Sequence, residues 1–119
     1  MNEHPGHHRK LLTVVTEAAL ESVLTRELPK WGAKGYTITN ARGRGHRGVR
    51  RAGWDADSNI RIEVVCDEPT ARRIADELQR RYYDNYAMIL VLSDVEVLRP
   101  AKFDSAGPTA SGEPGKPGQ

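Results

Sequence analysis

The chain has 119 residues and a mass of 13.2 kDa, which suggests one domain. Its net charge of +2 is too small by itself to indicate a nucleic-acid-binding protein. A single cysteine, Cys66, excludes disulfides and all-cysteine zinc sites within one chain, and no apolar run approaches the roughly 18 residues of a membrane span. We therefore expect a cytoplasmic protein, and because small domains gain stability by self-association, an oligomer.

Both ends of the chain are predicted to be disordered. Residues 1–9 are polar, and their histidines have no neighbouring acid or thiol framework, so we expect no metal site there. Residues 104–119 are rich in glycine and proline and contain no large apolar side chain, so they cannot bury enough surface to offset the entropy of ordering. The folded domain is accordingly predicted to span residues 10–103.

The first half of this domain alternates between strand and helix patterns. Residues 11–15 form a short β-type run, after which Thr16 offers a hydroxyl for a helix N-cap and Glu17 suits the positive end of a helix. Apolar residues then recur at helical spacing, and Pro29 and Gly32 indicate the stop. The β-branched content of residues 35–39 predicts a second strand.

The second half repeats the alternation. Residues 60–66 alternate strictly, which places one apolar face toward the core, and a helix is predicted to begin at 67–69 because proline suits a first helical turn. Its apolar stripe comprises Ala71, Ile74, Ala75 and Leu78. Residues 87–92 form a fourth strand. The order predicts an α+β fold of the ferredoxin-like βαββαβ type, with both helices on one face of the sheet.

A long connection, residues 41–58, separates the second and third predicted strands. Such a length is typical of a functional or disordered loop. The stretch 40–51, which overlaps it, holds five arginines and three glycines and no acid. Glycine lets backbone N–H groups approach a ligand closely, and arginine matches phosphate or carboxylate oxygens. These residues therefore predict an anion-binding loop.

This loop and its surroundings admit other interpretations. A solvated Arg/Gly linker is the plain alternative. RNA or DNA binding is disfavoured because the strand that would carry stacking aromatics offers Arg61, Glu63 and Val65. A catalytic triad is not apparent, since His46 is the only histidine outside the N-terminal end. Trp54 is a candidate for docking a partner, whereas the three tyrosines at positions 82, 83 and 86 are expected to pack at a helix end or to form a subunit contact.

Three segments in order, 35–39, 42–47 and 60–65, resemble the PII signalling proteins, small trimers with a ferredoxin-like subunit. The resemblance covers residues 10–102. The closer likeness is to the PII-like subgroup associated with inorganic-carbon uptake and carboxysomes, which shares Asp57-Ser58-Asn59 and the run from Tyr82 to Ala87. It implies a homotrimer with adenine nucleotide between subunits, and residues 41–58 would be the T-loop, the segment that reports binding to a target.

The resemblance also implies site residues. Those expected to contact nucleotide are Gly35, Tyr36, Thr37, Gly43, Gly45, His46, Arg47, Arg50, Glu63, Val65, Tyr86, Ala87, Met88, Arg99 and Lys102. Arg99 matches an arginine that reaches the phosphates across the subunit interface, and Lys102 takes the place of a second. His46 and Arg47 are the candidates for bicarbonate. The partner-binding part of the loop is assigned to Arg44, Arg51 and Trp54, and no metal is expected.

The departures from the family are informative as well. Other PII proteins carry a glycine- and lysine-rich B-loop for the outer phosphates, and residues 83–89 contain neither residue. AMP, ADP or cyclic AMP should therefore be favoured over ATP. The resemblance implies a non-catalytic regulator of inorganic-carbon metabolism, responsive to bicarbonate and acting on a bicarbonate transporter or a carboxysome-linked protein. It would be cytoplasmic and carboxysome-associated. A trimeric scaffold and an acylphosphatase-like enzyme are the alternatives.

Overall fold

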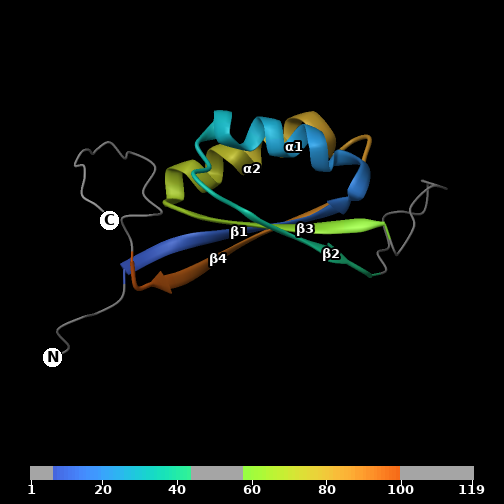
Figure 1. Ribbon diagram of the computed structural model, residues 1–119. Coiled ribbons are helices and arrows are strands. Elements are labelled where there is room, and N and C mark those ends of the chain that lie inside the picture. Colours follow the sequence, from blue (N-terminus) through green and yellow to red (C-terminus); the bar gives the residue numbers. More distant parts are fainter. Residues whose placement is uncertain (1–6, 44–57, 100–119) are drawn as a thin grey trace, which may run out of the picture.

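The computed structural model describes residues 7–43 and 58–99. One antiparallel sheet with the order β2-β3-β1-β4 is formed by β1 (His7–Glu17), β2 (Thr37–Ala41), β3 (Asn59–Cys66) and β4 (Met88–Val97). The helical elements are the 3-10 turn η1 (Ala18–Leu20), α1 (Glu21–Glu27), the 3-10 turn η2 (Leu28–Trp31) and α2 (Glu68–Tyr82). Both α-helices cover the same face of the sheet (Figure 1). The predicted ferredoxin-like βαββαβ arrangement is confirmed.

The core lies between this sheet face and the helices. On β3 the alternation is as predicted, with Ile60, Ile62, Val64 and Cys66 almost fully buried. The neighbouring strand β1 adds Leu12 and Val14, and its register pairs these with Val64 and Ile62. Side chains opposite each other in an antiparallel pair share a face, so the apolar residues of both strands meet the same helices.

Helix α2 begins and packs as the sequence predicts. The carboxylate of Asp67 accepts a hydrogen bond from the Thr70 N–H at 3.1 Å, which caps the helix, and Pro69 sits in the first turn. The predicted apolar stripe is buried, with Ala71, Ile74 and Leu78 fully enclosed. Hydrophobic burial on this stripe therefore holds α2 against the sheet.

The end of α1 is attached to α2 through Trp31 in η2. One guanidinium nitrogen of Arg73 donates to the Trp31 carbonyl at 3.1 Å, and the Arg81 guanidinium lies 5.2 Å from the centre of the indole ring. Gly32 then ends η2 with φ = +110°, a left-handed conformation in which other residues are strained. A Cβ there would also lie 3.1 Å from Thr70 and Arg73 atoms. Gly32 thus turns the chain toward β2.

Several predicted boundaries are wrong. Strand β1 begins at His7, so residues 7–9 belong to the sheet and not to the N-terminal end in which they were placed. The reason is pairing with the far end of β4, where His7 and His8 face Val97 and Glu96. That pairing also extends β4 to Val97 rather than Leu92. Strand β2 runs over 37–41, two residues later than predicted, so Ala41 belongs to a strand.

Thr16 is not a helix N-cap. It is the penultimate residue of β1, its side chain is fully buried, and its hydroxyl donates to the Ala87 carbonyl at 2.7 Å. The residue that precedes η1 is Glu17, which makes no side-chain capping bond. The extended backbone is favoured because β1 keeps partners on both sides as far as Thr16, namely Ile60 and Met88.

Cys66 lies on the core face of β3, as predicted, and burial raises the pKa of its thiol from about 9 to about 11. A shift of this size makes the thiolate population at a given mildly alkaline pH about 100-fold smaller than for an ordinary thiol. We expect Cys66 to react with Ellman's reagent about 100-fold more slowly in the folded protein than in urea. Equal rates in stopped-flow absorbance measurements would contradict this environment.

No helix within the described ranges is both long and apolar enough to cross a membrane.

Candidate functional site

The predicted nucleotide residues that the structure describes fall into two groups, one at the end of the sheet where residues 41–58 begin and one spread from the middle of the strands to the opposite end. The loop-base group comprises Gly43, Tyr86, Ala87 and Met88. The distal group comprises Gly35, Tyr36, Thr37, Glu63, Val65 and Arg99. The strand register separates them, because Thr16 at the end of β1 pairs with Met88, whereas His7 at its start pairs with Val97, two residues before Arg99.

The same separation is visible on β2. Thr37 at its start pairs with Glu63, and Ala41 at its end pairs with Asn59. Four strand residues span about 13 Å at the usual rise per residue. Figure 1 shows the consequence: β2 runs from the middle of the sheet to its end, where residues 41–58 begin. Within one chain, Thr37 and Glu63 therefore lie about 13 Å along the strands from the loop base, and Arg99, beyond the pair of His7 and Val97, lies farther away.

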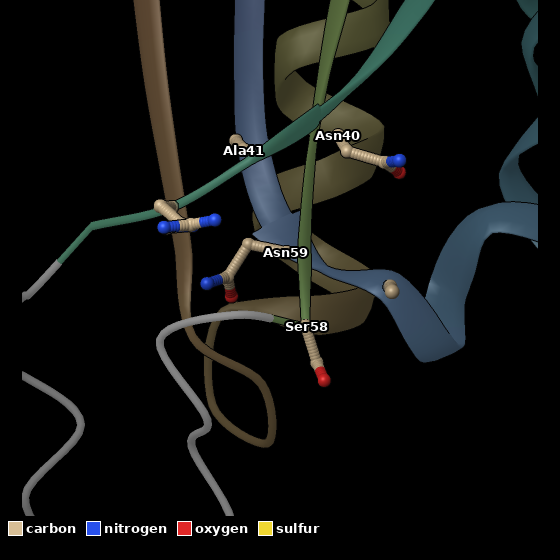
Figure 2. A pocket seen from close by; sticks show the side chains of 6 residues that line it. Asn40, Ala41, Ser58 and Asn59 are labelled. Atoms are coloured by element: carbon tan, nitrogen blue, oxygen red, sulfur yellow. The ribbon is translucent and has the colours of Figure 1, made fainter.

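A pocket of about 600 Å³ lies at the loop base, next to the first group (Figure 2). Its lining comes from the end of β2, the start of β3 and η1: Ala18, Asn40, Ala41, Arg42, Ser58 and Asn59. Amides, a hydroxyl and one guanidinium contribute to this lining, and it includes no carboxylate among the described residues. The chemistry of the pocket suits a polar or anionic ligand.

The loop-base group is held by the corner at the end of β1. The Glu17 carboxylate accepts a hydrogen bond from the Ala87 N–H at 2.7 Å, opposite the bond that Thr16 donates to the Ala87 carbonyl. The next residue, Ala18, donates its N–H to the Ser58 carbonyl at 2.8 Å. Three consecutive residues thus bind the segment before β4 through two side chains and the segment before β3 through one backbone N–H.

Of the three tyrosines at the end of α2, two pack within the chain, one of the two alternatives that the sequence left open. The rings of Tyr82 and Tyr86 meet edge to face, with centroids 5.7 Å apart, and both are partly buried against the core. Tyr83 is 41% exposed. The Tyr86 ring is therefore engaged within its own chain, and Tyr86 shapes the segment that leads into Ala87.

In the distal group, Thr37 and Glu63 are register partners on the sheet face that the helices leave open. Val65 lies on the same face of β3, and Tyr36 and Arg99 are exposed. A Cβ added at Gly35, or at Gly43 in the other group, would meet no atom of the described residues within 4 Å. Packing within the described part of the chain does not require glycine at either position, which leaves room for close approach by a ligand or a second chain.

The open face of the sheet is strongly apolar at one edge. Ile89 and Val91 of β4 are 52% and 46% exposed. Their register neighbours on β1 are Val15 and Thr13. Exposed β-branched residues in adjacent positions are typical of a surface that another chain covers.

Eight predicted site residues lie outside the described ranges: Arg44, Gly45, His46, Arg47, Arg50, Arg51, Trp54 and Lys102. Across residues 7–43 and 58–99, His, Cys, Asp and Glu side chains do not gather in groups of three that could hold a metal.

The structure also adds residues that sequence reasoning missed. Asn40, Ser58 and Asn59 were not predicted as site residues, although they line the loop-base pocket together with Arg42, one of the five arginines of the predicted anion-binding loop. Their signal was their position, since Asn40 opens that arginine- and glycine-rich stretch and Ser58 and Asn59 lie where the predicted loop ends. Thr16 and Glu17 gave a misleading signal, because a threonine and an acid before a helical pattern also predict a cap.

Comparisons with known proteins agree with this fold. The family model described as "Nitrogen regulatory protein P-II" matches residues 9–102. A crystal structure from Thermus thermophilus, assigned to the PII-like signalling proteins, is 45% identical, covers 81% of this chain and 95% of its own, and superposes with a TM-score of 0.68.

Two further structures are of CPII from Thiomonas intermedia K12. CPII bound to ADP, AMP and bicarbonate, a nitrogen regulatory PII-like protein, is 25% identical with a TM-score of 0.69. CPII bound to ADP and bicarbonate is 26% identical, also with a TM-score of 0.69. Each covers 82% of this chain and 95% of its own. With most of the chain matched by the family model and the same fold in these relatives, the chain belongs to the nitrogen regulatory protein P-II family.

Proposed function

We propose that this protein is a non-catalytic signalling protein that binds ADP, AMP or cyclic AMP, together with bicarbonate, between the subunits of a homotrimer. The observation that carries the proposal is the separation of the two groups of predicted contacts. Arg99 lies at the opposite end of the sheet from the loop base of the same chain, so the two can contribute to one site where two copies meet. A closed ring of three subunits has three identical head-to-tail interfaces. Each interface would form one nucleotide site, which gives one site per subunit.

The open sheet face supports this assembly. Exposed Ile89 and Val91 would be covered in a trimer, and the burial would compensate for the modest core of a small domain. A Cβ at Gly35 or Gly43 would meet no atom of the described residues within 4 Å. This open space fits the same arrangement, because a neighbouring chain or a nucleotide can approach the backbone there.

The ligands are inferred from the CPII structures, which hold ADP, AMP and bicarbonate. In this chain the arginines of residues 42–51 supply cationic groups for phosphate, with Arg99 and Lys102 contributed by the adjacent subunit. ATP is disfavoured because residues 83–89 provide no lysine or glycine for an outer phosphate. His46 and Arg47 are the groups that we assign to bicarbonate.

Binding would be converted to a signal through the T-loop, residues 41–58. Guanidinium groups that repel one another in the empty loop are neutralised by the bound anions, which favours one arrangement of the loop. Arg44, Arg51 and Trp54 would then meet the target protein. By its likeness to the carboxysome-associated subgroup, the target is a bicarbonate transporter or a carboxysome-linked protein in the cytoplasm, and the process is inorganic-carbon metabolism.

Titration calorimetry tests the proposal. Because nucleotide and bicarbonate neutralise the same cluster, bicarbonate should lower the Kd for ADP about 5- to 150-fold, and ADP should lower the Kd for bicarbonate by the same factor. The matched control replaces bicarbonate with chloride at equal pH and ionic strength. An unchanged ADP affinity would remove the coupling, and an absence of ADP binding would remove the proposal itself.

A further inference from the structure

The corner at the end of β1 joins two segments that belong to the loop-base group. Three consecutive residues, Thr16, Glu17 and Ala18, make hydrogen bonds of 2.7, 2.7 and 2.8 Å to Ala87, Ala87 and Ser58. Ala87 leads into β4, and Ser58 leads from the T-loop into β3. The corner therefore connects the end of the loop to the segment that carries Tyr86, Ala87 and Met88.

The hydrogen bonds to Ala87 take the place of main-chain hydrogen bonds between β1 and β4. The pairing of β1 with β4 ends at Thr16 and Met88, so Ala87 is the first residue beyond it. Its N–H and carbonyl are satisfied by the side chains of Glu17 and Thr16 in place of the main chain of β1. Successive side chains of a strand emerge on opposite faces, so these two residues hold Ala87 from two sides.

The chemistry of the two side chains suits this role. The Thr16 hydroxyl is fully buried, and a buried carbonyl left without its donor is costly. The Glu17 carboxylate accepts from a backbone N–H, and bonds to a charged acceptor are stronger than neutral ones. The turn that precedes Ala87 is held separately, by the Asn85 and Tyr86 N–H groups on the Tyr82 carbonyl. Ala87 is consequently fixed from both directions along the chain.

We propose that Thr16 and Glu17 are positioning residues for the nucleotide site, which hold Tyr86, Ala87 and Met88 in register with the base of the T-loop. The inference rests on the proposed function, since it concerns the same site. Because the hydrogen bonds of the corner link the two segments, a nucleotide that contacts one would also orient the other. Glu17 and Thr16 themselves touch backbone and need no contact with nucleotide.

The test compares E17A, which removes the acceptor, with E17Q, which keeps a carbonyl oxygen in the same place. Nucleotide affinity is measured by ADP calorimetry, and the Ala87 N–H is followed by NMR hydrogen exchange. We expect E17A to weaken ADP binding about tenfold and to accelerate Ala87 exchange, and E17Q to restore both to within about threefold of wild type. E21A is the matched control, because Glu21 is an exposed glutamate at the start of α1.

Each outcome decides between the two proposals. Faster exchange in E17A with wild-type ADP affinity would overturn the positioning role and leave nucleotide binding intact. Weaker ADP binding in E17A without faster Ala87 exchange would overturn it too, because the affinity would then depend on Glu17 by a route other than its bond to Ala87. If wild-type protein bound no ADP, the proposed function would fall. Should E17A fail to fold, T16S and T16V test the positioning role instead. T16S keeps the hydroxyl that donates to Ala87 and should bind ADP like wild type, whereas T16V lacks this hydroxyl and should bind ADP more weakly.

Discussion

Replacing Arg47 or Arg99 by glutamine is expected to weaken ADP binding about 10- to 100-fold. Each substitution removes one guanidinium from the phosphates, and a charge-assisted hydrogen bond contributes roughly 1.5 to 3 kcal/mol. Glutamine keeps a polar amide but is shorter and uncharged, so the loss reports the whole guanidinium group, its charge and its forked donors together. Calorimetry on each purified variant measures the effect. R26Q is the matched control, because Arg26 is exposed on α1, away from both groups.

Mixing the two variants tests where the site lies. If Arg47 comes from one subunit and Arg99 from its neighbour, trimers that contain both R47Q and R99Q chains hold one site with both arginines intact. Random reassembly of equal amounts then restores about a quarter of the sites to wild-type affinity. If both arginines served a site within one chain, no mixture could restore it. A mixture that binds no better than its components would exclude the inter-subunit site.

Replacing Ile89 by aspartate is expected to dissociate the oligomer. The side chain is 52% exposed in one chain, so the subunit can fold with aspartate there, but a covered sheet face cannot accept an unpaired carboxylate without a large desolvation penalty. Loss of the oligomer should abolish ADP binding as well, because each proposed site needs two chains. Sedimentation equilibrium and calorimetry on the same sample measure both effects.

The control for this variant is S22D, which places the same charge on an exposed position of α1. S22D should keep the oligomer and the ADP affinity of wild type. An I89D protein that remained trimeric would show that the open face of the sheet is not the interface. An I89D monomer that still bound ADP with wild-type affinity would show that the site does not require a second chain.

Much of the fold could be predicted from the sequence because it depends on local periodicity. The alternation on residues 60–66 placed the core face of β3 correctly, and the Asp67–Pro69 start of α2 was correct because a cap and a first-turn proline act within one helical turn. Predicted strand boundaries were wrong where pairing with a distant strand sets the end of the strand. Residues 7–9 have no strand pattern of their own and are extended because β4 pairs with them.

The site was predictable in composition but not in arrangement. Glycines and arginines between two strands indicate anion binding by their chemistry alone, and their order indicated the family. The structure then separated the described contacts into two groups, a result that follows from strand register. It also gave Thr16 and Glu17 a role that their local pattern had hidden, since a threonine and an acid suit a helix start and a strand end equally well.

By itself, the amino-acid sequence determined the number and order of the elements, the buried face of β3 and α2, and the cationic character of the loop, because these depend on residues within one turn or one strand of each other. Only the tertiary structure decided that Ala87 is held from β1, that Arg42 and Asn59 line one pocket, and that Arg99 lies at the opposite end of the sheet from the loop base. The physical reason is that strand pairing joins residues far apart in the chain, and its register is set by the packing of the whole sheet.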